Sequence, residues 1–345
     1  TPTGLIELAS YTRNKLNYVN FELLDLAKDL SAYHRNLADN SPTDYRGFVG
    51  RLLSQVVTIP DVIGISILFS SSYLSSIKLA EIIKKKWPTT KVIFGGGHVT
   101  FYHSTVFKDS DFVDYVFVGE AEIGFKKFIR KISADKSNEL SNISVEEIPG
   151  VYDRKKVNRD LEKGIVKAEF GELLIDLDQI GLPAYDLLDL ETYRKFSNAF
   201  PDGAIGVMME RGCPFKCTYC ASMVIHGSGI RTKSNQRIID DLIYLRDECG
   251  FSNIILWDDL LAARKTKFTA LADRIVAEGV NKGLLFSMPS GLSVRIMDDK
   301  LLESVCSLGF DYIRIMIESG SVDAQHNIVK KKVDLDKARH LIAHA

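Results

Sequence analysis

The chain has 345 residues, 46% of them apolar and 26% charged, and its formal net charge is −1. This length predicts two domains, and the near-neutral charge provides no field that would attract nucleic acid or an anionic membrane. No apolar stretch reaches the roughly 18 residues of a membrane-spanning helix. The short basic runs at 84–87 and 330–332 are interpreted as solvated helix ends.

The first third of the chain alternates apolar runs with amphipathic segments. Helical spacing predicts helices at 5–16, 44–57, 75–87 and 123–132, and apolar runs predict strands at 18–26, 61–69, 91–97 and 115–122. Strands without polar alternation are buried on both faces, as in a parallel sheet covered by helices. We therefore predict a doubly wound, Rossmann-like α/β domain over residues 1–145. Because the chain opens on a helix, we expect the first strand of this domain to be missing.

A polar, loop-like stretch at 134–148 leads into a linker over 146–197 with little regular pattern. The alternation then resumes, with strands predicted at 204–210, 253–259, 284–291 and 312–320 and helices at 236–248, 265–279, 299–308 and 334–345. Four βα units in series predict a partial (β/α) barrel over 198–345, with function at the carboxyl ends of its strands. An open barrel would expose a strand edge, so we expect this domain to be cut at its C-terminal end.

The stretch RGCPFKCTYC, residues 211–220, holds three of the five cysteines in a C-x3-C-x2-C spacing. Cys213, Cys217 and Cys220 directly follow the first barrel strand. Three soft ligands suit a [4Fe–4S] cluster with one open iron. The alternatives are buried free thiols or a zinc site with a remote fourth ligand such as His226. Clustered, odd-numbered cysteines favour a reducing cytoplasm over a disulfide framework, and Cys249 and Cys306, at helix ends, are interpreted as core residues.

The motif C-x3-C-x-aromatic-C, preceded by Arg-Gly after a strand, resembles the radical S-adenosylmethionine (SAM) superfamily. The form RGCPFKCTYC resembles the subgroup that carries an N-terminal cobalamin-binding domain. This resemblance implies that the three cysteines ligate three irons and that the open iron chelates the amino and carboxylate groups of SAM. It also implies that Tyr219 lies near the adenine.

Other barrel positions match this resemblance at the ends of the later strands. Asp258 and Asp259 end the second strand, where the family places polar groups against the SAM amino group, although the pair also suits a helix N-cap. Arg295 follows the third strand and would face the SAM carboxylate. Glu318 ends the fourth strand and is implied to bind the ribose hydroxyls. The sequence departs from the family pattern at Glu210, where a small hydroxyl residue is frequent.

Small residues end three strands of the first domain and suit close approach by a bulky ligand or, alternatively, tight βα turns. GGGHVT is not the G-x-G-x-x-G fingerprint of a dinucleotide site. The resemblance implies that these loops hold the cobalamin nucleotide tail through Ser70, Ser71, Ser72, Gly95, Gly96, Gly97, His98, Gly119 and Glu120. We interpret His98 as a turn residue near the tail. The residues contain no Asp-x-His-x-x-Gly motif, but that motif would lie in the segment expected to be missing. Radical SAM proteins of this kind mostly lack it, so the resemblance implies no protein histidine on cobalt.

The resemblance predicts a cytoplasmic enzyme that cleaves SAM reductively to a 5′-deoxyadenosyl radical and methylates an unactivated carbon, using a [4Fe–4S] cluster, SAM and cobalamin. The expected partners are a small-molecule substrate and an electron donor such as flavodoxin or ferredoxin, with no nucleic acid. Two alternatives are a radical cyclase or rearrangement enzyme without net methyl transfer and a non-catalytic cobalamin or Fe–S sensor.

Overall fold

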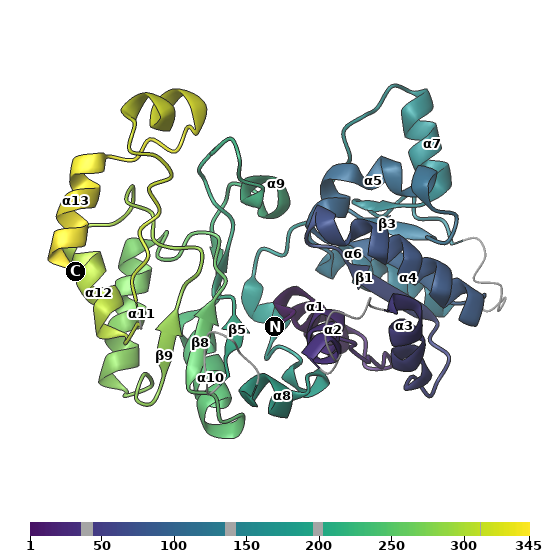
Figure 1. Ribbon diagram of the computed structural model, residues 1–345, viewed down its shortest axis with the longest axis horizontal. Coiled ribbons are helices and arrows are strands. Elements are labelled where there is room, and N and C mark those ends of the chain that lie inside the picture. The colour runs from purple at the N-terminus through teal and green to yellow at the C-terminus, as the bar shows by residue number, and fades with distance from the viewer. Residues whose placement is uncertain (36–43, 135–142, 196–202, 311) are drawn as a thin grey trace. The chain divides into compact units, whose positions relative to one another are not determined.

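The computed structural model describes residues 1–345 except 36–43, 135–142, 196–202 and 311, so most of the predicted loop at 134–148 lies outside the described residues (Figure 1). The described residues form two compact units. One spans Lys15–Leu174, and the other joins Thr1–Asn14 to Ile175–Ala345. Within the described ranges, no helix is both long and apolar enough to cross a membrane.

The unit Lys15–Leu174 is built on a four-stranded sheet. Its order is β1 (Val62–Ser66), β2 (Lys91–Gly95), β3 (Tyr115–Phe117), β4 (Val151–Tyr152). The first three strands are parallel, and β4 pairs antiparallel with β3. The helices are α2 (Leu26–Arg35), α3 (Tyr45–Ser54), α4 (Tyr73–Lys86), α5 (Gly97–Asp109), α6 (Glu122–Ala134) and α7 (Arg154–Glu162).

Both faces of this sheet are covered by helices. Successive residues of a strand point to opposite faces, so each face can pack in its own core. Val92 and Phe94 of β2 pack in a core with residues of α3, α4 and α5. Ile93, between them, packs in a second core with Phe128 and Ile132 of α6. The predicted parallel α/β sheet with helices on both faces is therefore confirmed for this part of the chain.

Three features of this unit differ from the sequence-based expectation. The predicted strand at 18–26 is wrong, since residues 16–25 form no strand and Leu16 packs into the core around Ile93. Helix α5 was not predicted because its aromatic and β-branched residues favour strands, and it is stabilised by packing of Val99 and Phe107. The predicted linker is also more regular than expected, since it contributes β4 and α7.

The second unit repeats strand and helix. A parallel sheet has the order β5 (Ile205–Val207), β8 (Asn253–Leu256), β9 (Leu285–Ser287), with helices α10 (Asn235–Ile243), α11 (Lys265–Ala277), α12 (Asp299–Ser307) and α13 (Leu335–His344). The predicted strand at 312–320 is reduced to isolated parallel bridges at Phe310 and Ile315. The partial barrel stays a prediction, whereas the parallel βα arrangement is observed.

Helix α1 (Thr3–Lys15) packs with this second unit, although the sequence suggested that it belonged to the first domain. Ser10 of α1 donates hydrogen bonds to the carbonyl oxygens of Ile180 (2.8 Å) and Leu182 (2.6 Å). Compact packing therefore divides the chain near residues 14 and 174, whereas the predicted functional domains were 1–145 and 198–345 with a linker between them. Short helix α8 (Leu190–Lys195) also lies in this unit.

Candidate functional site

The cysteine motif lies on a loop whose two ends are joined by a short hairpin. Strand β6 (Glu210–Arg211) pairs antiparallel with β7 (Arg231–Thr232), so that residues 212–230 form the loop between them. Gly212 has a φ of 97°, and a Cβ there would lie 2.4 Å from the Gly229 carbonyl oxygen. The glycine before the first cysteine is thus required by the close approach of the two ends of the loop.

The three cysteines of the loop are neighbours. Cys213 is buried, Cys217 half-buried and Cys220 exposed, and the Cys220 N–H donates to the Cys217 carbonyl oxygen at 3.1 Å. Burial raises the pKa of Cys213, and the nearby thiols and Asp259 add to this rise. In the described part of the chain no three His, Cys, Asp or Glu side chains are placed to hold one metal ion. The zinc alternative with His226 and the [4Fe–4S] cluster, in which each thiolate would bind a different iron, both stay predictions.

Four of the five residues predicted to bind SAM lie beside this loop. The Tyr219 hydroxyl donates to Glu318 Oε1 at 2.9 Å, and the Asp259 carboxylate accepts from the Gly212 N–H at 2.9 Å. The Arg295 guanidinium lies 3.8 Å from the ring centroid of Phe215, inside the motif. Residues from four segments far apart in the sequence therefore meet around the cysteines.

Lys331 is a residue of this site that the sequence did not indicate. Its run KKK was interpreted as a solvated helix end, which is wrong for Lys331 because this residue is only 8% exposed. The Nζ atom lies 2.6 Å from Glu318 Oε1. No local pattern could have identified it, because Lys330 and Lys332 on either side are exposed.

Asp258 has different surroundings from Asp259. Its side chain is fully buried, and Oδ1 accepts hydrogen bonds from the Met209 and Glu210 N–H groups at 2.9 and 2.5 Å. The helix N-cap alternative is wrong for Asp258, since α11 begins only at Lys265. Burial, followed by the adjacent Glu210 carboxylate, raises the pKa of Asp258 well above its usual value. Its role in SAM binding stays a prediction.

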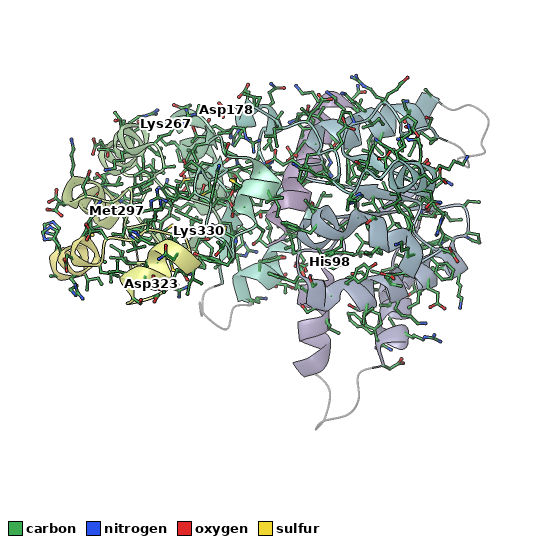
Figure 2. All side chains as sticks on the ribbon, turned by 90° about the horizontal axis from the view of Figure 1, so that it is seen from above. His98, Asp178, Lys267, Met297, Asp323 and Lys330 are labelled. Atoms are coloured by element: carbon green, nitrogen blue, oxygen red, sulfur yellow. The ribbon has the colours of Figure 1, made fainter. Side chains whose placement is uncertain are left out.

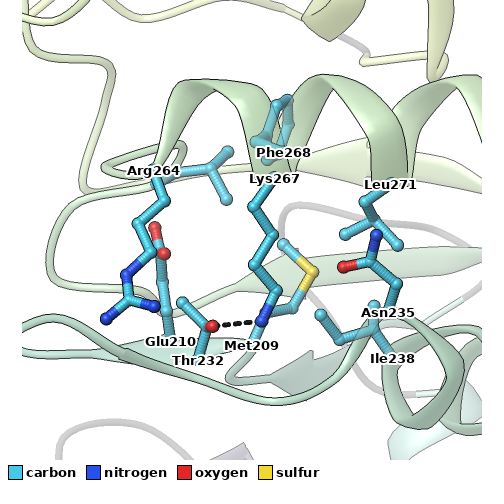
Figure 3. Close-up of a pocket in the computed structure, with 10 residues that line it drawn as sticks. Met209, Glu210, Thr232, Asn235, Ile238, Arg264, Lys267, Phe268 and Leu271 are labelled. Atoms are coloured by element: carbon cyan, nitrogen blue, oxygen red, sulfur yellow. Dashed lines mark hydrogen bonds between the residues drawn. The ribbon is translucent and has the colours of Figure 1, made fainter.

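Glu210 lines a small cavity of about 20 Å³, room for about one water molecule (Figure 3). Lys267 points into the same cavity and donates to the Thr232 hydroxyl. The Glu210 carboxylate accepts from the Ala263 N–H at 3.3 Å, and burial raises the pKa of Glu210 to about 7. Near neutral pH this carboxyl group therefore holds a proton part of the time.

A buried charge cluster anchors the hairpin to helix α1. It consists of Glu7, Arg211, Lys233 and Asp241, whose side chains are at most 4% exposed. Glu7 Oε2 lies 2.7 Å from Arg211 Nη2, and Glu7 Oε1 lies 3.0 Å from Lys233 Nζ. The two cations outweigh the effect of burial, so that the pKa of Glu7 is lowered. Arg211 of the motif thus has a structural role.

The unit Lys15–Leu174 has its own candidate site where β1, β2 and β3 end. The His98 N–H donates to the Ile67 carbonyl oxygen at 3.0 Å, which ties the loop after β2 to the loop after β1. The Thr100 hydroxyl donates to the Gly96 carbonyl (3.0 Å) and accepts from the Gly119 N–H (3.1 Å). The predicted cobalamin residues after three strands therefore lie at one edge, as expected for parallel strands.

His98, which is labelled in Figure 2, connects several of these residues. Its Nδ1 lies 2.9 Å from the Ser70 hydroxyl, and its ring packs between Tyr73 and Tyr102 with centroid distances of 4.4 and 5.0 Å. The interpretation as a turn residue is wrong, since His98 lies in the first turn of α5. Its Nε2 atom is buried with no hydrogen-bond partner among the described residues, which is the kind of atom that a polar group of a ligand would satisfy.

The remaining residues of this edge suit a large ligand. Ser70, Ser71 and Ser72 form an exposed 3₁₀ turn, and Phe69 before them is 71% exposed. Gly96 has a φ of 95°, and a Cβ there would lie 2.8 Å from the Ile67 carbonyl oxygen. Glycine at this position is therefore required by the fold itself, whatever ligand binds.

Comparison with known proteins found one matching family model and several relatives of this chain. A family model described as the B12 binding domain matches residues 51–129, which include every residue predicted above for cobalamin. The uncharacterized methyltransferase PH0819 of Pyrococcus horikoshii is 30% identical over 76% of this chain and 52% of its own length. The cytidylyl-2-hydroxyethylphosphonate methyltransferase of Streptomyces wedmorensis is 26% identical over 83% of this chain and 55% of its own. The chain thus spans about half the length of these relatives.

A solved structure has the same fold. The cobalamin-dependent S-adenosylmethionine radical enzyme OxsB, determined with aqua-cobalamin and S-adenosylmethionine bound, superposes with a TM-score of 0.70 at 18% identity. The superposition covers 100% of this chain and 45% of OxsB. At this identity the likeness describes the fold, and the chemistry must be argued from the residues.

Proposed function

We propose that this chain belongs to the radical SAM proteins with a cobalamin-binding domain and forms part of an enzyme that cleaves SAM reductively and methylates an unactivated carbon of a small molecule. The observation that carries this proposal is the meeting of Tyr219, Glu318 and Arg295 around three neighbouring thiols. When bound, the cluster supplies the electron that cleaves SAM to methionine and a 5′-deoxyadenosyl radical, and cobalamin supplies the methyl carrier.

The residues around the cysteine loop fit SAM chemically. Cys213, Cys217 and Cys220 supply three soft ligands, which suit a cluster whose fourth iron binds substrate. The Glu318 side chain is 26% exposed and can accept hydrogen bonds from two hydroxyl groups. Arg295 is exposed and offers a fork of donors to a carboxylate. These side chains would hold SAM in a fixed orientation against the cluster, which is the contribution that the protein makes to such reactions.

The edge of the sheet in the other unit fits the nucleotide tail of cobalamin. A bulky group can approach the backbone at the exposed serine turn, at Gly95–Gly97 and at Gly119. His98 Nε2 has no hydrogen-bond partner among the described residues and could bond to a polar group of the tail. We propose that His98 contacts the tail through this Nε2 atom and that no protein histidine ligates cobalt, as the resemblance implies. We also propose a cytoplasmic location and an electron donor such as flavodoxin or ferredoxin, since a thiolate cluster requires reducing conditions.

Reconstitution under anaerobic conditions with iron, sulfide and cobalamin tests this function. We expect about four irons per chain, a corrinoid absorption spectrum, and formation of both 5′-deoxyadenosine and S-adenosylhomocysteine on reduction in the presence of SAM. Cys217→Ala should abolish iron loading and deoxyadenosine formation, whereas Cys306→Ala, at an exposed cysteine outside the motif, should change neither. Deoxyadenosine without S-adenosylhomocysteine would favour a radical cyclase, and neither product with no SAM binding would favour a sensor.

A further inference from the structure

Lys331, which is largely buried, forms an ion pair with the partly exposed Glu318 beside the cysteine loop. The Lys331 side chain is 10% exposed, and its ammonium lies 2.6 Å from Glu318 Oε1. A lysine is rarely buried to this extent without a partner, because desolvation of its charge costs several kcal/mol. The burial of Lys331 therefore depends on this carboxylate.

Glu318 is held in an unusual conformation. Its φ is 71°, a left-handed value that is strained for a residue other than glycine. Gln325, which is fully buried, maintains the neighbouring backbone, because its Nε2 donates to the carbonyl oxygens of Ile317 and Ser319 (2.7 Å to the latter). A strained backbone supported in this way is typical of a functional position.

Both donors that reach the Glu318 carboxylate contact the same oxygen. The Tyr219 hydroxyl and the Lys331 ammonium bind Oε1 at 2.9 and 2.6 Å. The second oxygen, Oε2, accepts no hydrogen bond from the described residues, so its lone pairs remain for hydroxyl donors of a ligand. The hydrogen bond from the ammonium also lowers the pKa of Glu318 from its usual value.

The segment that carries Lys331 also holds the cysteine loop. Thr218, directly after the second cysteine of the motif, donates its N–H to the Val329 carbonyl at 3.0 Å and its hydroxyl to the Ile328 carbonyl at 2.8 Å. Lys330, labelled in Figure 2, and Lys332 both have left-handed φ values of 55° and 54°. These contacts fix the position of Lys331 relative to the loop.

We propose that Lys331 is a positioning residue for SAM, which holds the Glu318 carboxylate turned so that Oε2 receives the vicinal ribose hydroxyls. This inference rests on the proposed function. An ionised acceptor binds hydroxyl groups about twice as strongly as a neutral one, and a carboxylate held by two neighbours loses little freedom when the ligand binds. Lys331 would thus act through Glu318 without touching the reacting atoms.

The test compares Lys331→Met with Lys332→Met. The control also removes one lysine charge, but at the next residue, whose side chain is exposed. Equilibrium dialysis of the reconstituted protein should show SAM bound about tenfold more weakly by Lys331→Met and unchanged by Lys332→Met. Lys331→Arg should restore part of the affinity. Iron content and circular dichroism, measured on each variant, show whether the cluster and fold are retained.

A SAM analogue that lacks both ribose hydroxyls separates positioning from general stabilisation. The wild type should prefer SAM to this analogue, and Lys331→Met should lose most of that preference. In a Glu318→Gln background, Lys331→Met should cause little further loss, and Lys331→Arg gives the same comparison if the methionine variant does not fold. An unchanged preference in Lys331→Met would overturn this inference alone, whereas a wild-type protein that loads iron but binds no SAM would overturn the proposed function as well.

Discussion

Replacement of Glu210 by glutamine should change how the stability of the second unit depends on pH. The pKa of this carboxyl group is about 7 in the folded protein, against 4.5 for an ordinary glutamate, because the side chain is buried. Between these values the folded state binds more protons than the unfolded state, so wild-type stability falls as pH rises from about 4.5 to about 7. Glutamine mimics the protonated carboxyl group and removes this loss.

The magnitude follows from the interval between the two pKa values. At about 1.4 kcal/mol per pH unit, ionisation of Glu210 costs the wild type about 3 kcal/mol by pH 8. The free energy of unfolding of Glu210→Gln should therefore match that of the wild type near pH 4.5 and exceed it by about 3 kcal/mol at pH 8.

Urea unfolding of the cluster-free chain measures this difference. The sequence has two tryptophans, one in each compact unit. A Trp87→Phe background leaves Trp257, next to Asp258, as the reporter of the second unit. Glu303→Gln, at an exposed glutamate of the same unit, should follow the wild-type curve. A constant difference between Glu210→Gln and the wild type from pH 5 to pH 8 would refute the reasoning.

Two further substitutions test the packing around the candidate sites. Gly96→Ala should destabilise the unit Lys15–Leu174 by about 2 kcal/mol and weaken corrinoid binding, because the new methyl group meets the Ile67 backbone. Its control, Gly50→Ala, lies on an open face within α3 and should stabilise the same unit by about 0.5 kcal/mol. Glu7→Ala should cost about 3–5 kcal/mol by removing the buried carboxylate that Arg211 and Lys233 share. Asp186→Ala, which breaks an exposed pair, should cost less than about 1 kcal/mol. Thermal unfolding monitors both pairs, and similar effects within either pair would contradict the packing argument.

The local sequence pattern predicted secondary structure correctly wherever a spacing or residue type is typical of a single kind of element. Continuous apolar runs predicted β1, β2 and β3, and helical spacing predicted α4, α6 and α11 close to their observed bounds. The pattern misled at 18–26, where apolar residues cover a core without pairing as a strand, and at α5, whose residues favour strands outside this packing. Cys306 was expected in the core but is exposed, since its helix turns it away from the buried face.

The sequence by itself determined the cysteine motif, the parallel α/β character and the resemblance that these carry, because metal ligands and apolar periodicity are local properties. Only the tertiary structure decided how the charged residues around the cysteine loop are paired. Glu7 meets Arg211 across about two hundred residues, and Lys331 reaches Glu318 although its flanking lysines face solvent. Whether a charge is buried against a partner or exposed to water depends on which segments pack together, and no spacing along the chain contains that information.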